Sequence, residues 1–201
     1  MGCDVKILIS GGAKNGKSMY AQKIAKAMSV EYDVPLYYVA TMEPVDEEDK
    51  NRIQRHVHER AGWGFITIEE PRKLAEIFER GISSAEDAIS SIDRGTARLE
   101  NVDERGVFLV DSLTALLGNN MFLRNGNKNL DCFDDVCDDI YRFSMKASNI
   151  VLVSDAIGCD GTKFDDFTEA YRRTLARLER EIASYYDRVT EVSVGQIIEF
   201  K

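Results

Sequence analysis

Residues 11–18 carry residue types, at a defined spacing, that suit the binding of a triphosphate. They read Gly-Gly-Ala-Lys-Asn-Gly-Lys-Ser, which satisfies the pattern G-x-x-x-x-G-K-[ST], and they follow the apolar run 5–9. In this context the glycines let backbone N–H groups point at a phosphate, which the positive end of the next helix also attracts. Lys17 is predicted to contact the β- and γ-phosphates, and the Ser18 hydroxyl to ligate Mg²⁺. The predicted nucleotide-binding residues here are Gly11, Gly12, Ala13, Lys14, Asn15, Gly16, Lys17 and Ser18.

A carboxylate at the end of a neighbouring strand would complete such a site, because the water shell of the metal needs an anionic anchor. The apolar run 107–110 ends in Asp111. Many surface strands end in aspartate, so the inference depends on the phosphate-binding loop beside it. Asp111 is predicted to hold Mg²⁺ together with Ser18.

The only two histidines lie in the highly charged segment 47–60. On a helix, Arg52, His56 and Arg60 would form one stripe, whereas His58 would point to nearly the opposite side. A histidine between arginines is a poor general base but a fair nucleophile toward a phosphorus centre whose oxygens the arginines neutralise. From the residues alone, a solvated charged helix is the more frequent explanation of such a segment.

The pattern of apolar runs predicts the fold class. Runs of strand length with little polar alternation occur at residues 5–9, 35–40, 65–68, 107–110 and 150–153. Segments with helical spacing occur at residues 17–28, 47–60, 74–80, 113–122, 133–146 and 167–186. This alternation predicts an α/β fold like that of P-loop NTPases, with a doubly wound, mainly parallel sheet and helices on both faces. Residues 188–194 and 197–200, separated by a turn at Gly195-Gln196, predict a C-terminal antiparallel edge hairpin.

Length and composition indicate how the chain is organised. With 201 residues, 44% of them hydrophobic, we expect a single nucleotide-binding domain over residues 1–201. Two polar stretches, at about 81–106 and 124–131, interrupt the alternation and are predicted to be surface excursions or lids.

Charge and cysteine content indicate the class of partner and the compartment. The net charge of -9 argues against sequence-independent binding of nucleic acid or anionic membrane, which needs a broad basic field. The apolar run 5–9 meets Gly11 too soon to be a signal sequence or a membrane span. The four cysteines have no zinc-ligand spacing and indicate no disulfide framework, as in a reducing cytosol. We therefore expect a cytoplasmic protein that binds phosphate locally.

Several motifs together resemble the bifunctional adenosylcobinamide kinase / adenosylcobinamide-phosphate guanylyltransferase family of cobalamin biosynthesis. The phosphate-binding loop is shared with many NTPases, but Arg-Ile-x-x-His after an Ala-Thr strand end is far more specific. The resemblance covers nearly the whole chain outside the two polar stretches. Its residues are Gly11 to Ser18, Ala40-Thr41, Asp46, Glu48, Arg52-Ile53-Gln54-Arg55-His56, Arg60, Trp63, Thr67, Glu69, Pro71, Asp111-Ser112-Leu113-Thr114, Asn119, the strand and turn 151–158, Tyr171-Arg172 and Arg177.

The resemblance implies two reactions and a role for several residues. ATP or GTP would phosphorylate the aminopropanol hydroxyl of adenosylcobinamide, and GMP would then pass from GTP through a guanylylated histidine to the cobinamide phosphate. By position, His56 matches that histidine, and Glu69 could accept the N1 and N2 hydrogens of guanine. Lys17, Arg52 and Arg60 could share the triphosphate, with Ala40 and Thr41 close to the nucleotide. Relatives of this kind imply a homo-oligomer, specifically a trimer, with a corrinoid as the second substrate.

One departure from the family leaves two alternatives open. The family commonly reads Asn-Glu-Val-Gly after the fifth strand, where this chain has Asp155-Ala156-Ile157-Gly158. Ala156 cannot replace the charge or the hydrogen bonds of a glutamate. The alternatives are a P-loop kinase of another small molecule and a nucleotide-binding regulatory paralogue without turnover.

Overall fold

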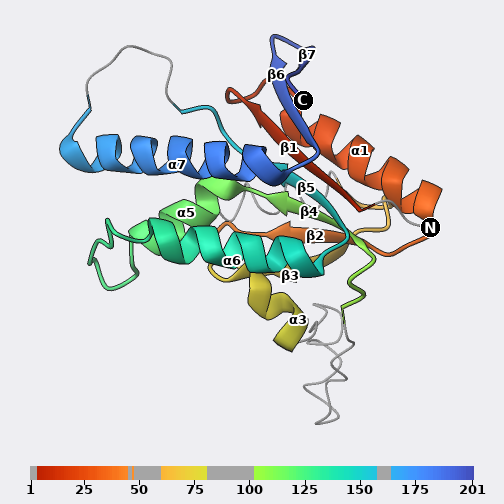
Figure 1. Cartoon of the computed structure of the whole chain (residues 1–201), viewed down its shortest axis with the longest axis horizontal. Helices are drawn as coiled ribbons and strands as arrows, with labels where there is room; N and C mark the ends of the chain where they lie inside the picture. The colour runs from red at the N-terminus through yellow and green to blue at the C-terminus, as the bar shows by residue number, and fades with distance from the viewer. Residues whose placement is uncertain (1–3, 45–46, 48–59, 81–101, 158–163) are drawn as a thin grey trace.

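The computed structural model describes residues 4–44, 47, 60–80, 102–157 and 164–201, which form a seven-stranded sheet flanked by helices (Figure 1). The strands are β1 Val5–Gly11, β2 Leu36–Ala40, β3 Ile66–Glu69, β4 Val107–Asp111, β5 Asn149–Val153, β6 Arg188–Ser193 and β7 Gln196–Glu199. They lie in the order β3-β2-β4-β5-β1-β6-β7, and only β6 and β7 pair antiparallel. The predicted mainly parallel α/β sheet with a C-terminal hairpin is therefore confirmed.

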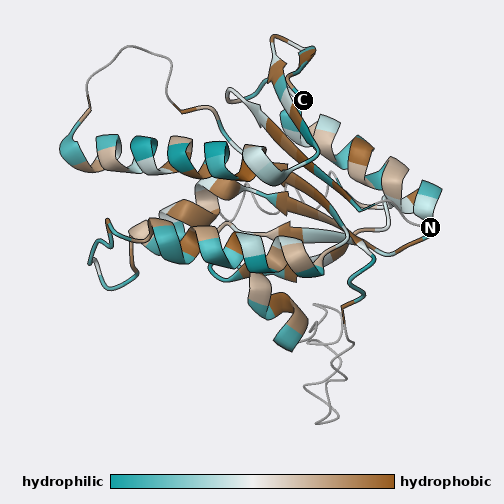
Figure 2. Cartoon of the chain, in the orientation of Figure 1, coloured by the Kyte–Doolittle hydropathy of each residue, from teal (hydrophilic) through white to brown (hydrophobic). Residues whose placement is uncertain are grey.

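Helices cover both faces of this sheet, as predicted. They are α1 Lys17–Tyr32, the 3-10 turn η1 Leu74–Glu76, α3 Ile77–Arg80, α5 Leu113–Met121, α6 Phe133–Lys146 and α7 Asp166–Tyr185. Helix α1 packs its small buried residues on one face, and α5, α6 and α7 lie together on the other (Figure 1). The central strands β1, β4 and β5 are mainly hydrophobic and the outer sides of α6 and α7 hydrophilic (Figure 2), because helices cover both faces of a parallel sheet and turn their outer sides to water.

Neighbouring residues of β2 belong to different cores, because successive side chains of a strand point to opposite faces. Tyr37 stacks on Phe108, with ring centroids 4.8 Å apart, in the core beneath α5, α6 and α7. Tyr38 belongs to the core beneath α1, where Phe65 meets its ring edge-on. The two tyrosines therefore serve different sides of the molecule.

The start of the segment after β3 is fixed by a buried carboxylate. Asp139 on α6 is 9% exposed and accepts hydrogen bonds from the backbone N–H groups of Leu74 (2.7 Å) and Ala75 (3.2 Å). Burial raises the pKa of Asp139, and these two N–H bonds oppose the rise. The helix predicted at residues 74–80 is thus a 3-10 turn, η1, followed by the short α3.

The hairpin turn lies one residue earlier than predicted. Strand β6 ends at Ser193 and β7 begins at Gln196, so the turn residues are Val194 and Gly195 rather than Gly195 and Gln196. Their φ angles are 50° and 75°. Two consecutive positive φ angles match the twist of the flanking strands. A β-branched residue seldom adopts such a φ, so the sequence favoured the wrong register.

None of the described helices is long and apolar enough to cross a membrane.

Candidate functional site

The phosphate-binding loop joins β1 to α1 at the carboxyl edge of the sheet. Gly16 precedes α1 with φ 91°, a left-handed conformation that favours glycine. A Cβ at Gly11 would lie 2.4 Å from the Val192 carbonyl oxygen of β6, so only glycine permits this close approach. The strand predicted before residues 11–18 and the helix predicted after the glycine-rich turn are therefore both present.

The Asn15 side chain stabilises the loop by two hydrogen bonds. Its Oδ1 accepts a hydrogen bond from the Lys17 backbone N–H (3.1 Å), and its Nδ2 donates to the Val192 carbonyl. The loop is thereby attached both to its own helix and to the neighbouring strand.

Lys17 is directed at the next strand end, where it meets a carboxylate. Its Nζ lies 2.5 Å from Asp155 Oδ1 and 3.2 Å from the Gly12 carbonyl oxygen. The Lys17 side chain is 8% exposed and that of Asp155 33%. The ammonium group is therefore held at the mouth of the loop by an ion pair that a triphosphate would have to share or displace.

Asp155 is in turn the end of a chain of hydroxyl groups across the strand ends. Its Oδ2 accepts from Thr114 Oγ1 (2.9 Å), which lies 2.8 Å from Ser112 Oγ. The Ser112 backbone exchanges two hydrogen bonds with Thr41 Oγ1, at 2.6 and 2.8 Å. On α7, Tyr171 donates to the Thr114 carbonyl (2.8 Å). These contacts couple the ends of β2, β4 and β5 to the lysine of the loop.

A second carboxylate, that of Glu179, lies near Asp155. Glu179 on α7 is half-buried. Burial raises the pKa of Glu179, the Ser154 hydroxyl opposes the rise, and the neighbouring charge of Asp155 adds to it. Asp155, the ion-pair partner of Lys17, therefore has a second acidic group near it.

Asp111, the last residue of β4, is connected through Tyr38 to Arg60, which is the last residue of the charged segment 47–60 that contains both histidines. The Tyr38 hydroxyl donates to Asp111 Oδ2 (2.8 Å), and the Arg60 guanidinium lies 3.4 Å above the Tyr38 ring. Tyr38 is 5% and Arg60 6% exposed. Burial and the adjacent Asp111 raise the pKa of Tyr38, so its hydroxyl keeps the proton that it donates.

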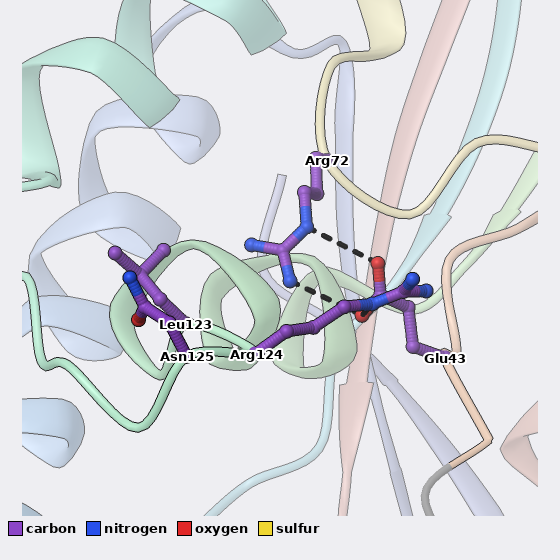
Figure 3. Close-up of a pocket in the computed structure, with 5 residues that line it drawn as sticks. All are labelled: Glu43, Arg72, Leu123, Arg124 and Asn125. Atoms are coloured by element: carbon purple, nitrogen blue, oxygen red, sulfur yellow. Dashed lines mark hydrogen bonds and ion pairs between the residues drawn. The ribbon is translucent and has the colours of Figure 1, made fainter.

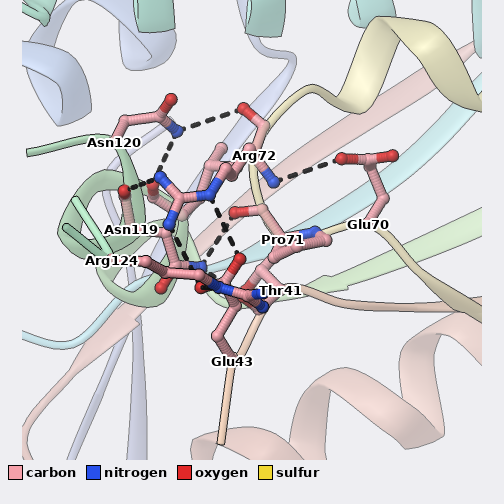
Figure 4. A network of polar contacts seen from close by, with 9 residues as sticks. Thr41, Glu43, Glu70, Pro71, Arg72, Asn119, Asn120 and Arg124 are labelled. Carbon is pink, nitrogen blue, oxygen red and sulfur yellow. Dashed lines mark hydrogen bonds and ion pairs between the residues drawn. The ribbon is translucent and has the colours of Figure 1, made fainter. Parts of the chain in front are cut away.

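A polar network ties the strand ends on the β3 side. Glu43 accepts two hydrogen bonds from Arg72 (both 3.1 Å) and one from Arg124 (2.9 Å), beside an open hollow (Figure 3). Partial burial alone would raise the pKa of Glu43, but these bonds lower it. Asn119 Nδ2 donates to the carbonyls of Thr41 (2.7 Å) and Pro71 (2.9 Å), as Figure 4 shows. The loops after β2 and β3 are therefore fastened to the end of α5.

The predicted site residues fall into three groups: those at the carboxyl edge of the sheet, Arg60 on the Tyr38 ring, and those outside the described residues. Lys17, Ser18, Ala40, Thr41, Glu69 and Asp111 share the carboxyl edge of the sheet, since Ala40 is paired with both Asp111 and Glu69. Glu69 is exposed at the end of β3, whereas the Thr41 hydroxyl is occupied by Ser112. Arg52, His56 and His58 lie outside the described residues.

The described residues contain no group of three or more histidine, cysteine, aspartate or glutamate side chains placed to hold a metal ion. A Mg²⁺ site of the predicted type does not need one, because Mg²⁺ keeps several waters and takes one or two protein ligands plus phosphate oxygens. Asp111 presents a carboxylate that Tyr38 binds through one oxygen, and Ser18 lies in the first turn of α1. The residues present fit such an ion.

Comparison with known proteins decides the family. The family described as cobinamide kinase / cobinamide phosphate guanyltransferase matches residues 7–102 and 86–200. The chain belongs to this family. It is accordingly a bifunctional transferase of cobalamin biosynthesis, a kinase and a guanylyltransferase, and this confirms the resemblance carried by the motifs.

One curated relative matches over nearly its whole length. The "Bifunctional adenosylcobalamin biosynthesis protein CobP" of Pseudomonas aeruginosa is 29% identical over 190 residues, which is 94% of this chain and 92% of the relative. Among solved structures, the flagellar accessory protein FlaH of Methanocaldococcus jannaschii has a TM-score of 0.46 at 13% identity, covering 100% of this chain and 80% of that one. A DnaB-like replicative helicase has a TM-score of 0.49 at 12% identity, covering 94% and 47%.

Three of the side chains that organise the site were not predicted. In the sequence, Tyr38 is only one residue of an apolar run, and no motif surrounds Glu43 or Arg72. Asp155 stands out only as a departure from the family pattern. Its position two residues after the buried strand β5, close to the place that Asp111 takes at the end of β4, was the signal that could have placed it at the site.

Proposed function

We propose that this chain phosphorylates adenosylcobinamide with ATP or GTP and then guanylylates the product through His56. The observation that carries this proposal is the buried Lys17 at the carboxyl edge of the sheet, where it pairs with Asp155, in a chain of this family. Both reactions need one triphosphate anchored at that edge, and they differ in which phosphorus atom is attacked.

In the first reaction, the aminopropanol hydroxyl oxygen attacks the γ-phosphorus and gives up its proton to water, and the nucleoside diphosphate leaves with the electron pair of the broken P–O bond. Residues 11–18 would bind the β- and γ-phosphates by backbone N–H groups and the helix terminus. Lys17 would leave Asp155 for the phosphate oxygens, where negative charge increases in the transition state. Mg²⁺ at Ser18 and Asp111, when bound, would neutralise charge on the leaving group.

In the second reaction, a ring nitrogen of His56 attacks the α-phosphorus of GTP and pyrophosphate leaves. A phosphate oxygen of the cobinamide phosphate then attacks the same phosphorus, and the P–N bond to His56 breaks to give adenosylcobinamide-GDP. Arg52 and Arg60 would neutralise the phosphate oxygens around the reacting phosphorus. Glu69, exposed at the end of β3, would accept the guanine N1 and N2 hydrogens.

We further propose that the enzyme acts in the cytoplasm as a homo-oligomer, a trimer. Support for the subunit number comes from the family resemblance. Size-exclusion chromatography with light scattering would give the mass directly, and a mass of about three chains is the expected result.

Incubation with GTP labelled at the α-phosphate tests the proposed function. We expect acid-labile, base-stable label on the wild-type protein, transferred to adenosylcobinamide phosphate on its addition. A parallel assay follows GTP consumption with and without adenosylcobinamide, which should stimulate it. Stimulated consumption without protein label would indicate a plain kinase. Nucleotide binding with neither label nor stimulation would indicate a regulatory paralogue.

A further inference from the structure

Tyr38 contacts two side chains, Asp111 and Arg60, to which we assign different roles in the two reactions. Its hydroxyl reaches along β2 to Asp111 Oδ2, 2.8 Å away, at a strand end on the same edge of the sheet as the phosphate-binding loop. Its ring face carries the Arg60 guanidinium at 3.4 Å, and its ring edge meets Phe65 at a centroid distance of 6.0 Å. One side chain thus contacts both the carboxylate of the nucleotide site and the arginine next to the histidine segment.

Arg60 is held by this ring at the point where the chain turns toward β3. The Trp63 backbone N–H donates to the Arg60 carbonyl (3.1 Å), and Gly62 and Gly64 have φ angles of 80° and 81°. Arg60 is 6% exposed and its guanidinium lies against an aromatic face, where a cation gains from the ring quadrupole and from its own planar stacking. The turn 60–64 is therefore fixed to the sheet through Tyr38.

We propose that Tyr38 is a positioning residue that couples the two reactions: its hydroxyl orients Asp111 for both, and its ring seats Arg60 for guanylylation alone. This inference rests on the proposed function for its second half. It goes beyond that function by assigning a role to a side chain that reacts with neither substrate. The two contacts use different parts of the tyrosine, so different substitutions separate them.

The two substitutions have different expected effects. Tyr38→Phe keeps the ring under Arg60 but removes a hydrogen bond to a charged group, which should lower both reaction rates about tenfold. Tyr38→Leu removes the hydroxyl and the ring. It should lower the kinase rate as Tyr38→Phe does, but guanylylation by about a further tenfold, since the desolvated cation–π contact is lost as well.

Tyr37 provides the matched control. It precedes Tyr38 on β2 and is also buried, but its ring stacks on Phe108 and its hydroxyl accepts from the Asp103 backbone N–H (3.1 Å) on the opposite face. Tyr37→Phe removes a buried phenol hydroxyl without touching Asp111 or Arg60. We expect it to leave the ratio of the two rates unchanged.

Trp63 supplies a readout that does not depend on activity. It is the only tryptophan, half-buried, and one turn from Arg60. Acrylamide quenching of its fluorescence should match wild type in Tyr38→Phe and Tyr37→Phe, and should increase in Tyr38→Leu. Arg60→Lys, which keeps the charge but loses the planar stacking, should also increase quenching, and it serves as a second variant if Tyr38→Leu folds poorly.

The experiment measures, for each variant, the kinase rate, the rate of GMP adduct formation by intact mass, and Trp63 quenching. A lowered ratio of adduct to kinase rate in Tyr38→Leu and Arg60→Lys, with increased quenching, supports the coupling role. The coupling role is overturned if the ratio and the quenching are unchanged in both variants. It is also overturned if Tyr37→Phe lowers the ratio as much as Tyr38→Leu does. If wild type forms no adduct, the guanylyl-transfer function fails, whereas the quenching results still decide whether Tyr38 seats Arg60.

Discussion

Replacement of Asp155 by asparagine is predicted to tighten nucleotide binding. Lys17 Nζ lies 2.5 Å from Asp155 Oδ1, so a triphosphate must compete with this carboxylate for the lysine. Asparagine has nearly the same size and can still accept the hydrogen bond from Thr114. It removes only the negative charge, and it is the residue that the family pattern commonly has at this position.

The size of the effect follows from the burial of the pair. Exposed ion pairs contribute about 0–1 kcal/mol, whereas loss of a partner from a buried pair costs about 3–5 kcal/mol. The Lys17 side chain is 8% exposed and that of Asp155 33%, so the pair lies between these limits. When a nucleotide binds to wild type, its phosphates replace Asp155 as the partner of Lys17, which offsets part of the free energy lost with this ion pair. In Asp155→Asn we expect the binding free energy of the nucleotide to be more favourable by about 1–2 kcal/mol, which corresponds to a Kd about five- to thirtyfold lower.

Calorimetric titration with a non-hydrolysable GTP analogue measures this change. Asp103→Asn is the matched control, since it removes an aspartate from an exposed pair with Arg105 at the opposite edge of the sheet. The control should leave the Kd unchanged, and the gain in Asp155→Asn should shrink as salt screens the pair. An equal or weaker affinity in Asp155→Asn would refute competition between carboxylate and phosphate for Lys17.

Three further predictions follow from buried groups. Glu179→Gln should increase the free energy of unfolding at pH 7, because the raised pKa of Glu179 makes its charged form costly; in urea titrations this gain should vanish below about pH 4.5. A gain that persists at low pH would contradict the cause. Asp139→Ala should lower the free energy of unfolding by about 2–3 kcal/mol in urea, since two backbone N–H groups lose their acceptor; a loss under about 0.5 kcal/mol would contradict it. Lys17→Ala should lower kcat/KM of the kinase and the adduct rate by about a hundredfold each, and retention of either rate would exclude a shared triphosphate site.

The fold was largely predictable because strands β1, β2, β4 and β5 are mainly buried on both faces. Such strands appear in the sequence as short continuous apolar runs, and glycine-rich turns or helical spacing separate them. The phosphate-binding loop and Asp111 were predictable for the same reason, since each directly follows one of these runs. The hairpin turn was predicted one residue late, because Val194 adopts a positive φ that its residue type disfavours.

The contacts that organise the site were not predictable from residue order. Lys17 and Asp155 are far apart in the sequence and meet only because β1 and β5 are neighbours in the sheet. The same holds for Tyr38 and Asp111, whose pairing depends on the register of β2 with β4. The network of Glu43 with Arg72 and Arg124 joins three loops, and such loop contacts leave no periodic pattern in a sequence.

Identification of the amino acid that carries GMP tests the central proposal most directly. Wild type, His56→Ala and His58→Ala are incubated with GTP, and the adduct is located by peptide mass spectrometry. We predict GMP on His56 in wild type and in His58→Ala, and no adduct in His56→Ala although nucleotide binding at the phosphate-binding loop persists. An adduct that survives His56→Ala would contradict the proposed route through this histidine.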